Sequence, residues 1–187
     1  MPELTGMLLI VVVLALLFDF SNGWHDSANA IATVVSTRVV SPLVAVMASG
    51  VLNVAGAFMS TAVAKMVGSG IVNPAFVTQE MVAAALAGAI LWNLFTLLLG
   101  LPTSSSHALI GGYAGAAISN VGFQALVFDA RWPRGWLGTV SFIVISPTVG
   151  MFAGLALMTG VFWAFRRVAP SRVDKYFRFM QLVSSSL

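Results

Sequence analysis

Polar side chains gather at two places in an otherwise apolar sequence, and both groups have the chemistry to bind small ions. The first place is residues 19–29, which contain Asn22, His25, Asp26 and Asn29. Asp26 and Asn29 are three apart and would share one helix face, with Asn22 and His25 on or beside it. Oxygen ligands from Asp26, Asn22 and Asn29 suit Na⁺, whereas a carboxylate beside the His25 imidazole suits a proton relay. The alternative is that Asp26 only caps the helix that follows.

The second place is residues 100–107, where Pro102 precedes a run of serines. Pro102 lacks a backbone donor and ends the preceding helix, so Thr103 or Ser104 is the natural N-cap of a new helix. The first turn of that helix would present free N–H groups, and the serine hydroxyls Ser104, Ser105 and Ser106 lie beside them. Such a helix start binds anions, and phosphate suits it well. The alternative is a serine-rich kink that satisfies backbone groups between two helices.

Composition shows that membrane helices must position these groups. Of the 187 residues, 59% are hydrophobic and 8% are charged, and the mean hydropathy is +0.97. Soluble domains carry about 25% charged residues, so a soluble enzyme or a nucleic-acid-binding domain is excluded. The sequence contains no cysteine, which excludes disulfides, thiolate metal sites and a cysteine nucleophile.

The spacing of the charged residues predicts the spans. Residues 39–64 and 135–165 are free of charge and exceed the roughly 20 residues that a membrane crossing needs. Residues 81–128 have room for two passes, or for one pass and a re-entrant segment. Residues 5–18 are too short, so the polar group that follows them predicts a helix broken partway across. We therefore expect an all-α, polytopic membrane helix bundle with two broken or re-entrant segments, which point to a transporter binding site.

The C-terminal end differs from the rest of the chain. Five of the nine basic residues lie in residues 166–187, as expected of a cytoplasmic flank under the positive-inside rule. The chain is therefore divided into a transmembrane part, residues 1–165, and a basic amphipathic linker or start of a further helix, residues 166–187. The predicted location is the cell (inner) membrane, with several passes.

A charge argument links the two polar groups. A phosphate held by the serine turn at ~4–5 Å from an ionised Asp26 would be repelled by roughly 3–4 kcal/mol at an effective dielectric of about 20. No Lys or Arg lies in either segment to offset this repulsion. A cation must therefore enter with the anion, which favours coupled uptake over a bare anion channel.

Two long motifs resemble those of the PiT inorganic phosphate transporters. Residues 22–38, NGWHDSANAIATVVSTR, resemble the first signature of that family, and residues 100–112, GLPTSSSHALIGG, resemble the second. The resemblance, supported by Trp92 and by the stretch that begins at Gln181, covers essentially the whole chain. The His25–Asp26 pair is similar to the bacterial low-affinity branch, which implies uptake of phosphate with H⁺, often as a metal–phosphate complex. Na⁺ stays open as the coupling ion because the neighbours of Asp26 supply oxygen ligands.

The resemblance also implies roles for individual residues. Phosphate would contact Thr103, Ser104, Ser105, Ser106 and Asn29, and the coupling cation would use Asp26 and Asn29. His25 and Asn22 are added to the cation site from their position on or beside the same helix face. No catalytic residue, resident metal or cofactor is expected. Family members have two inverted repeats, and this sequence has one copy of each motif, so it is expected to be the N-terminal half. Its partners would be phosphate, the cation, the lipid bilayer and the missing C-terminal repeat, with a homodimer left open and no nucleic acid.

Two other functions stay open from the residues. An intramembrane hydrolase would use Ser106 or a neighbouring serine with His107 and Asp26, but neighbours in sequence on a helix do not face each other. The Gly-x-Ser-x-Gly nucleophile elbow is also absent from the sequence. A passive anion channel would conduct without any cation gradient.

Overall fold

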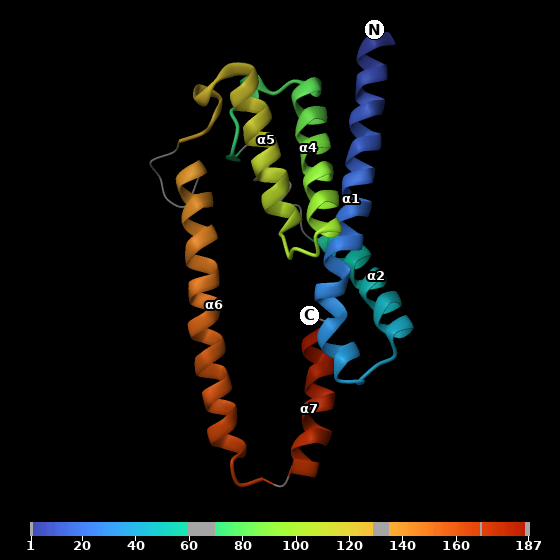
Figure 1. Cartoon of the computed structure of the whole chain (residues 1–187), viewed down its shortest axis with the longest axis vertical. Helices are drawn as coiled ribbons and strands as arrows, with labels where there is room; N and C mark the ends of the chain where they lie inside the picture. The colour runs from blue at the N-terminus through green and yellow to red at the C-terminus, as the bar shows by residue number, and fades with distance from the viewer. Residues whose placement is uncertain (1, 60–69, 129–134, 169, 186–187) are drawn as a thin grey trace.

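The computed structural model describes residues 2–59, 70–128, 135–168 and 170–185. Over these residues the chain forms α1 (Pro2–Ser36), α2 (Pro42–Met59), α4 (Gln79–Leu98), α5 (Ser105–Val121), α6 (Gly135–Phe165) and α7 (Pro170–Ser185), with 3-10 helices η1 (Pro74–Phe76) and η2 (Phe123–Ala125). Four of them, α1, α2, α4 and α6, are long and apolar enough to cross a membrane. The expected all-α, polytopic membrane fold is confirmed (Figure 1).

α1 runs without interruption through residues 19–29, so the expected break in this segment is wrong. The segment contains no proline, and polar side chains on one face leave the backbone hydrogen bonds of a helix intact. Ser21 contacts α4, His25 contacts the segment before α5, and Asp26 contacts α5 itself. Because protein covers these side chains, the helix does not need to break in order to keep them out of lipid.

The second interruption is present and forms the tip of a helical hairpin between α4 and α5. Gly100 has a φ of +65°, and the N–H of Leu101 donates to the carbonyl of Thr96 at 2.9 Å, which closes the end of α4. Pro102 follows and prevents the helix from continuing. α5 then begins at Ser105 after the N-cap Ser104, as the sequence predicts. The tip meets α1 partway along its length (Figure 1).

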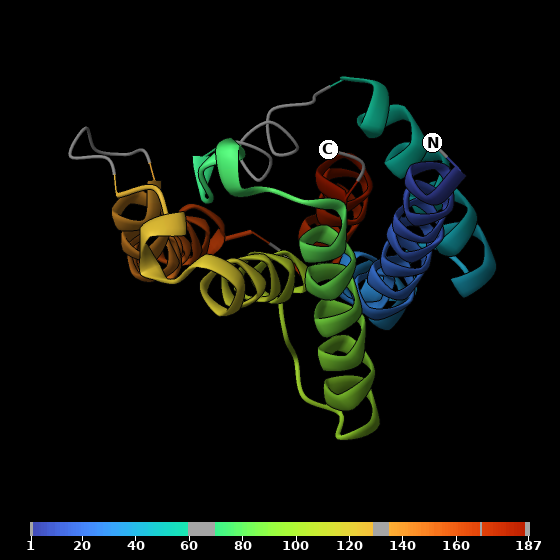
Figure 2. The same cartoon turned by 90° about the horizontal axis from the view of Figure 1, so that it is seen from above.

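α4 lies between α1 and α5, and α2 lies on the far side of α1 (Figure 2). Leu86 and Ala89 of α4 pack against Phe18 of α1. On the α5 side the backbones approach closely, since a Cβ at Gly112 would lie 2.7 Å from the carbonyl oxygen of Ala85. Small residues allow this approach between membrane helices. α4 therefore holds the hairpin against α1.

A larger apolar core closes the far end of the hairpin. It combines α4 and α5 with the segments that precede and follow them, which pair through an isolated β-bridge between Val72 and Leu126. The buried members of this core are Ile71, Val72, Met81, Ala85, Ile110, Tyr113, Ala114, Ala117, Ala125 and Leu126. With one end fixed by this core, the position of the tip depends on how α4 and α5 pack.

α6 lies apart from α1 and α4, on the side of α5, whereas α7 lies beside the C-terminal end of α1 (Figure 1). α6 has the bounds expected from the charge-free stretch, and its buried residues are Gly135 and Gly138 at its start. α7 contacts α1 at the C-terminal end of that helix, where Gln181 Nε2 donates to the carbonyl of Thr33 at 3.1 Å. Thr37 Oγ1 donates to Gln181 Oε1 at 3.2 Å. The division of the chain at residue 165 coincides with the end of α6, and the roles of the two parts stay a prediction.

α1 ends in a Schellman-type turn with Arg38 in the left-handed region. The N–H of Val39 donates to the carbonyl of Val34, and the N–H of Arg38 donates to the carbonyl of Val35. Arg38 has a φ of +55°, at the position where helices usually place glycine. A side chain in this conformation costs roughly 1–2 kcal/mol. Arginine at this position therefore destabilises the fold relative to glycine.

Candidate functional site

Asp26 and Ser105, which are far apart in the sequence, meet where the hairpin tip touches α1. Ser105 Oγ donates to Asp26 Oδ2 at 3.3 Å, and Ser105 is 1% exposed. Ser105 is the first residue of α5, so the carboxylate lies at the positive end of that helix, where negative charge is stabilised. The structure thus brings together one residue from each of the two polar groups in the sequence.

A second contact joins His25 to the tip through two threonines. His25 Nε2 lies 3.4 Å from Thr103 Oγ1, which lies 3.2 Å from Thr96 Oγ1. The Thr96 hydroxyl donates to the carbonyl of Trp92 at 2.9 Å, so Thr103 donates to Thr96 and the imidazole Nε2–H donates to Thr103. In the neutral imidazole Nδ1 is then the acceptor, and this nitrogen is buried with no hydrogen-bond partner among the described residues.

Asn93 completes this buried polar layer, and the sequence interpretation missed it. Asn93 is 2% exposed, and its Nδ2 donates to Ser21 Oγ at 3.4 Å. The Ser21 hydroxyl donates to the carbonyl of Phe18, so it can only accept from Asn93, which fixes the orientation of the amide. Asn93 Oδ1 is left buried without a donor in the described part of the chain.

A sequence signal for this layer did exist. Asn93 and Thr96 are the two residues of 81–98 with an amide or hydroxyl side chain. Their spacing of three places them on one helix face. Ser21 likewise lies four positions before His25 on α1. A polar pair inside a charge-free span that leads directly to the serine run would have indicated a buried site.

The hydroxyl groups on the outer side of the tip are open to a bound ion. Ser104 and Ser106 are exposed, and Ser104 Oγ accepts from the N–H of His107 at 3.4 Å as the N-cap of α5. The first N–H groups of a helix have no intrahelical acceptor. A groove of about 560 Å³ opens here, lined by Gly88, Trp92, Thr103, Ser104, His107, Ala108, Gly111 and Gly112. The tip can therefore present hydroxyl and amide donors to an anion.

Of the two asparagines in the first motif, Asn22 and Asn29, the structure places the side chain of Asn22. Asn22 is half-buried and lies four residues before Asp26, so both are on the same face of α1. The side chain of Asn29 lies outside the described residues. Within the described ranges, no three His, Cys, Asp or Glu side chains gather at one point. The groups available to an ion are therefore hydroxyls, amides, the imidazole and one carboxylate.

Comparisons with known proteins agree on one family. The family model described as "Phosphate transporter family" matches residues 22–187. The chain is 46% identical to a probable low-affinity inorganic phosphate transporter of Rhizobium meliloti, and the match covers 100% of this chain and 53% of the relative. It is 47% identical to the protein of the same name from Streptomyces halstedii, and the match covers 98% of this chain and 84% of that relative.

A solved structure shares the fold. The structure entitled "The sodium-dependent phosphate transporter" matches with a TM-score of 0.76 and 26% identity, over 89% of this chain and 42% of that one. The chain thus spans about half the length of the Rhizobium meliloti relative and less than half of the solved structure.

Proposed function

Because the chain belongs to the phosphate transporter family, we propose that it forms part of a secondary transporter that moves inorganic phosphate across the cell membrane together with a cation. The observation that carries this proposal is the contact between Ser105 and Asp26. It joins a helix start rich in hydroxyl groups to a carboxylate inside a membrane-spanning helix. The relatives' names, inorganic phosphate transporters, support phosphate as the substrate.

The phosphate would bind at the hairpin tip. Ser104 and Ser106 are exposed there, and the first turn of α5 adds N–H groups without an intrahelical acceptor. Thr103 and Ser105 line the inner side of the tip toward α1. We assign Asn29 to the same site from the family motif. Many neutral donors would bond to the four oxygens of phosphate, so that no Lys or Arg is needed to bind it.

Asp26 would make the binding of phosphate depend on a cation. An ionised Asp26 beside the phosphate repels it, so phosphate binds well only when Asp26 is neutralised. We propose H⁺ as this cation, carried by Asp26 or by His25. Na⁺ is the second candidate, because Asp26, Asn22 and Asn29 supply oxygen atoms and the solved relative is named sodium-dependent. A divalent metal would enter as cargo with the phosphate.

Transport would require the hairpin to move against α1. Among the described residues, three side-chain hydrogen bonds join α1 to the hairpin, and all three are long, at 3.3 Å and 3.4 Å. A second repeat, expected from the family, would complete the site. The serine contacts do not favour a hydrolase: Ser104 accepts from a backbone N–H of His107, and Ser105 donates to Asp26 directly instead of through an imidazole.

The test is uptake of labelled phosphate into proteoliposomes. They would contain the chain alone, or a chimera in which it replaces the matching residues of the Rhizobium meliloti relative. An imposed pH or Na⁺ gradient should drive uptake, and Asp26→Ala or Ser105→Ala should abolish it without loss of membrane insertion. The matched control is Ser141→Ala on α6, whose hydroxyl donates to the carbonyl of Leu137 one turn earlier in the same helix.

Two outcomes of this assay would contradict the proposal. Normal coupled uptake in both variants would refute the assignment of the site. Phosphate flux through the parent chain that needs no cation gradient, and that is unchanged in Asp26→Asn, would indicate a passive channel.

A further inference from the structure

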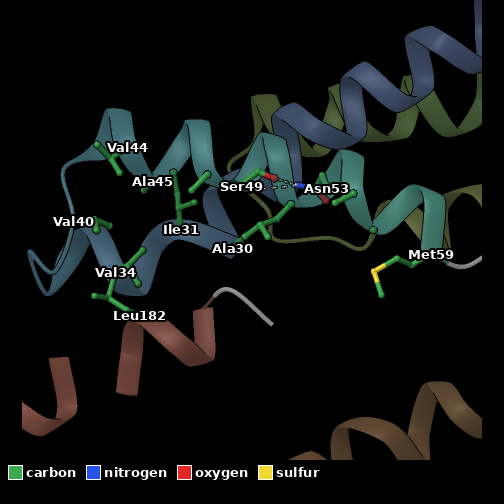
Figure 3. Close-up of a pocket in the computed structure, with 14 residues that line it drawn as sticks. Ala30, Ile31, Val34, Val40, Val44, Ala45, Ser49, Asn53, Met59 and Leu182 are labelled. Carbon is green, nitrogen blue, oxygen red and sulfur yellow. Dashed lines mark hydrogen bonds between the residues drawn. The ribbon is translucent and has the colours of Figure 1, made fainter. Parts of the chain in front are cut away.

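A groove of about 650 Å³ lies between α1 and α2, with α7 at one end, away from the hairpin tip (Figure 3). Val34, Val40 and Leu182 gather at the α7 end, and Met59 lies at the other. The remaining lining residues are Ala30, Ile31, Val44, Ala45, Ala48, Ser49, Leu52, Asn53, Ala55 and Gly56. The groove is thus apolar over nearly all of its wall.

The two polar residues of the wall bond to each other. Asn53 Nδ2 donates to the backbone carbonyl of Ser49 at 3.0 Å and lies 3.3 Å from Ser49 Oγ (Figure 3). The Asn53 amide N–H groups therefore find acceptors within α2 itself. This wall suits an apolar ligand better than a polar one.

Arg38 borders the α7 end of the groove. It lies in the turn between two lining residues, Val34 and Val40, and its side chain is exposed. Its backbone is held in the left-handed region that glycine adopts without strain. A basic residue at the C-terminal end of a helix interacts favourably with the helix dipole. A basic residue at position 37 would make the same interaction without the strain of a left-handed backbone. The exposed guanidinium is thus available to a ligand at this end of the groove.

The basic residues also identify the leaflet. α1 and α6 end at the same end of the molecule, next to α7 (Figure 1). Arg38, Arg166, Arg167 and Arg178 belong to these ends and to α7. The positive-inside rule places them on the cytoplasmic side, where the leaflet carries anionic lipid.

We propose that this groove binds one acyl chain of an anionic glycerophospholipid of the cytoplasmic leaflet, with Arg38 at its headgroup phosphate. The wall from Val44 to Met59 runs for about 22 Å along α2. One leaflet of a membrane with a ~30 Å hydrocarbon core is about 15 Å deep, so the groove is long enough for a whole chain. Charge at the mouth and apolar walls behind it match the two parts of such a lipid. This site is separate from the phosphate site and does not depend on it.

The test is native mass spectrometry of the purified chain with phosphatidylglycerol and phosphatidylcholine, together with the lipid-induced shift in thermal unfolding. Phosphatidylglycerol should bind more tightly than phosphatidylcholine. Arg38→Gln and Arg38→Gly should each weaken its binding by about fivefold, the worth of one basic residue near a charged surface. Arg38→Gly relieves the left-handed backbone, so its lipid-free unfolding temperature should not fall. The matched control Arg167→Gln, at the end of α6, should bind phosphatidylglycerol like the parent.

A bulky residue in the groove tests the acyl-chain part. Ala48→Trp should weaken the binding of both lipids to a similar degree, while Arg38→Gln should weaken that of phosphatidylglycerol more than that of phosphatidylcholine. Equal binding of the two lipids by the parent, or unchanged phosphatidylglycerol binding in both Arg38 variants, would overturn the proposal. A dimer that Ala48→Trp disrupts, and that excludes phosphatidylglycerol, would show instead that a second copy occupies the groove.

Discussion

Gly112 sets the distance between α4 and α5, and its replacement by alanine should loosen the hairpin. The new Cβ would lie 2.7 Å from the carbonyl oxygen of Ala85, about 0.7 Å closer than ordinary contact, and 3.6 Å from the N of Ala89. These are backbone atoms, which cannot rotate away, so the helices must separate. Overpacking of this kind costs about 1–3 kcal/mol.

Gly115→Ala is the matched control, because a Cβ at Gly115 meets nothing within 4 Å. Replacing glycine by alanine in a helix gains up to about 1 kcal/mol at either position. The difference in the free energy of unfolding between the two variants therefore isolates the clash, and Gly112→Ala should be less stable by about 1–3 kcal/mol. Chemical unfolding in detergent, followed by circular dichroism, measures this difference. Equal stability of the two variants would refute the close approach of α4 and α5.

Three further substitutions separate stability from function at the hairpin. Ser104→Ala should lower the free energy of unfolding by about 0.5–2 kcal/mol through loss of the N-cap, whereas Ser104→Asp should keep the cap and stop phosphate uptake by charge repulsion; uptake by Ser104→Asp would count against an anion at the tip. Asn93→Leu removes a buried acceptor without a donor, so the stability should change by less than about 1 kcal/mol while uptake falls; unaffected uptake would show that Asn93 does not position α1. Thr78→Ala removes the N-cap of α4 at the far end of the hairpin, and should cost about 0.5–2 kcal/mol with uptake normal in the folded fraction; loss of uptake there would argue against a site confined to the tip.

The local features of the hairpin and of α6 could be predicted from the sequence because they depend on strong, short-range signals. Pro102 ends a helix by its covalent structure, and Ser104 caps the next one through its own hydroxyl. The charge-free residues 135–165 coincide with α6. Each of these predictions needed only neighbouring residues.

The continuity of α1 and the role of Asn93 depend on packing, which the sequence shows only indirectly. The polarity of residues 19–29 predicts a break, but these polar side chains lie on a continuous helix. What allows this is cover by α4 and by the hairpin tip, and these come from residues much later in the chain. The charge argument assumes that the serine turn and Asp26 lie close together, and only the fold shows the contact between Asp26 and Ser105 and its distance.

The most direct test of the account asks whether phosphate at the tip needs a cation because of Asp26. The chain has no cysteine, so Ser106→Cys, at an exposed position of the tip, gives one thiol whose rate of maleimide labelling reports on occupancy. The measurement would use the chimera in lipid nanodiscs, with any cysteines of the relative's part replaced.

Phosphate should slow this labelling only at low pH or in Na⁺, while sulfate serves as the anion control. Adding Asp26→Asn should make the protection by phosphate independent of the cation. Protection that is equal with and without the cation in the chimera with intact Asp26, or no protection under any condition, would contradict the account.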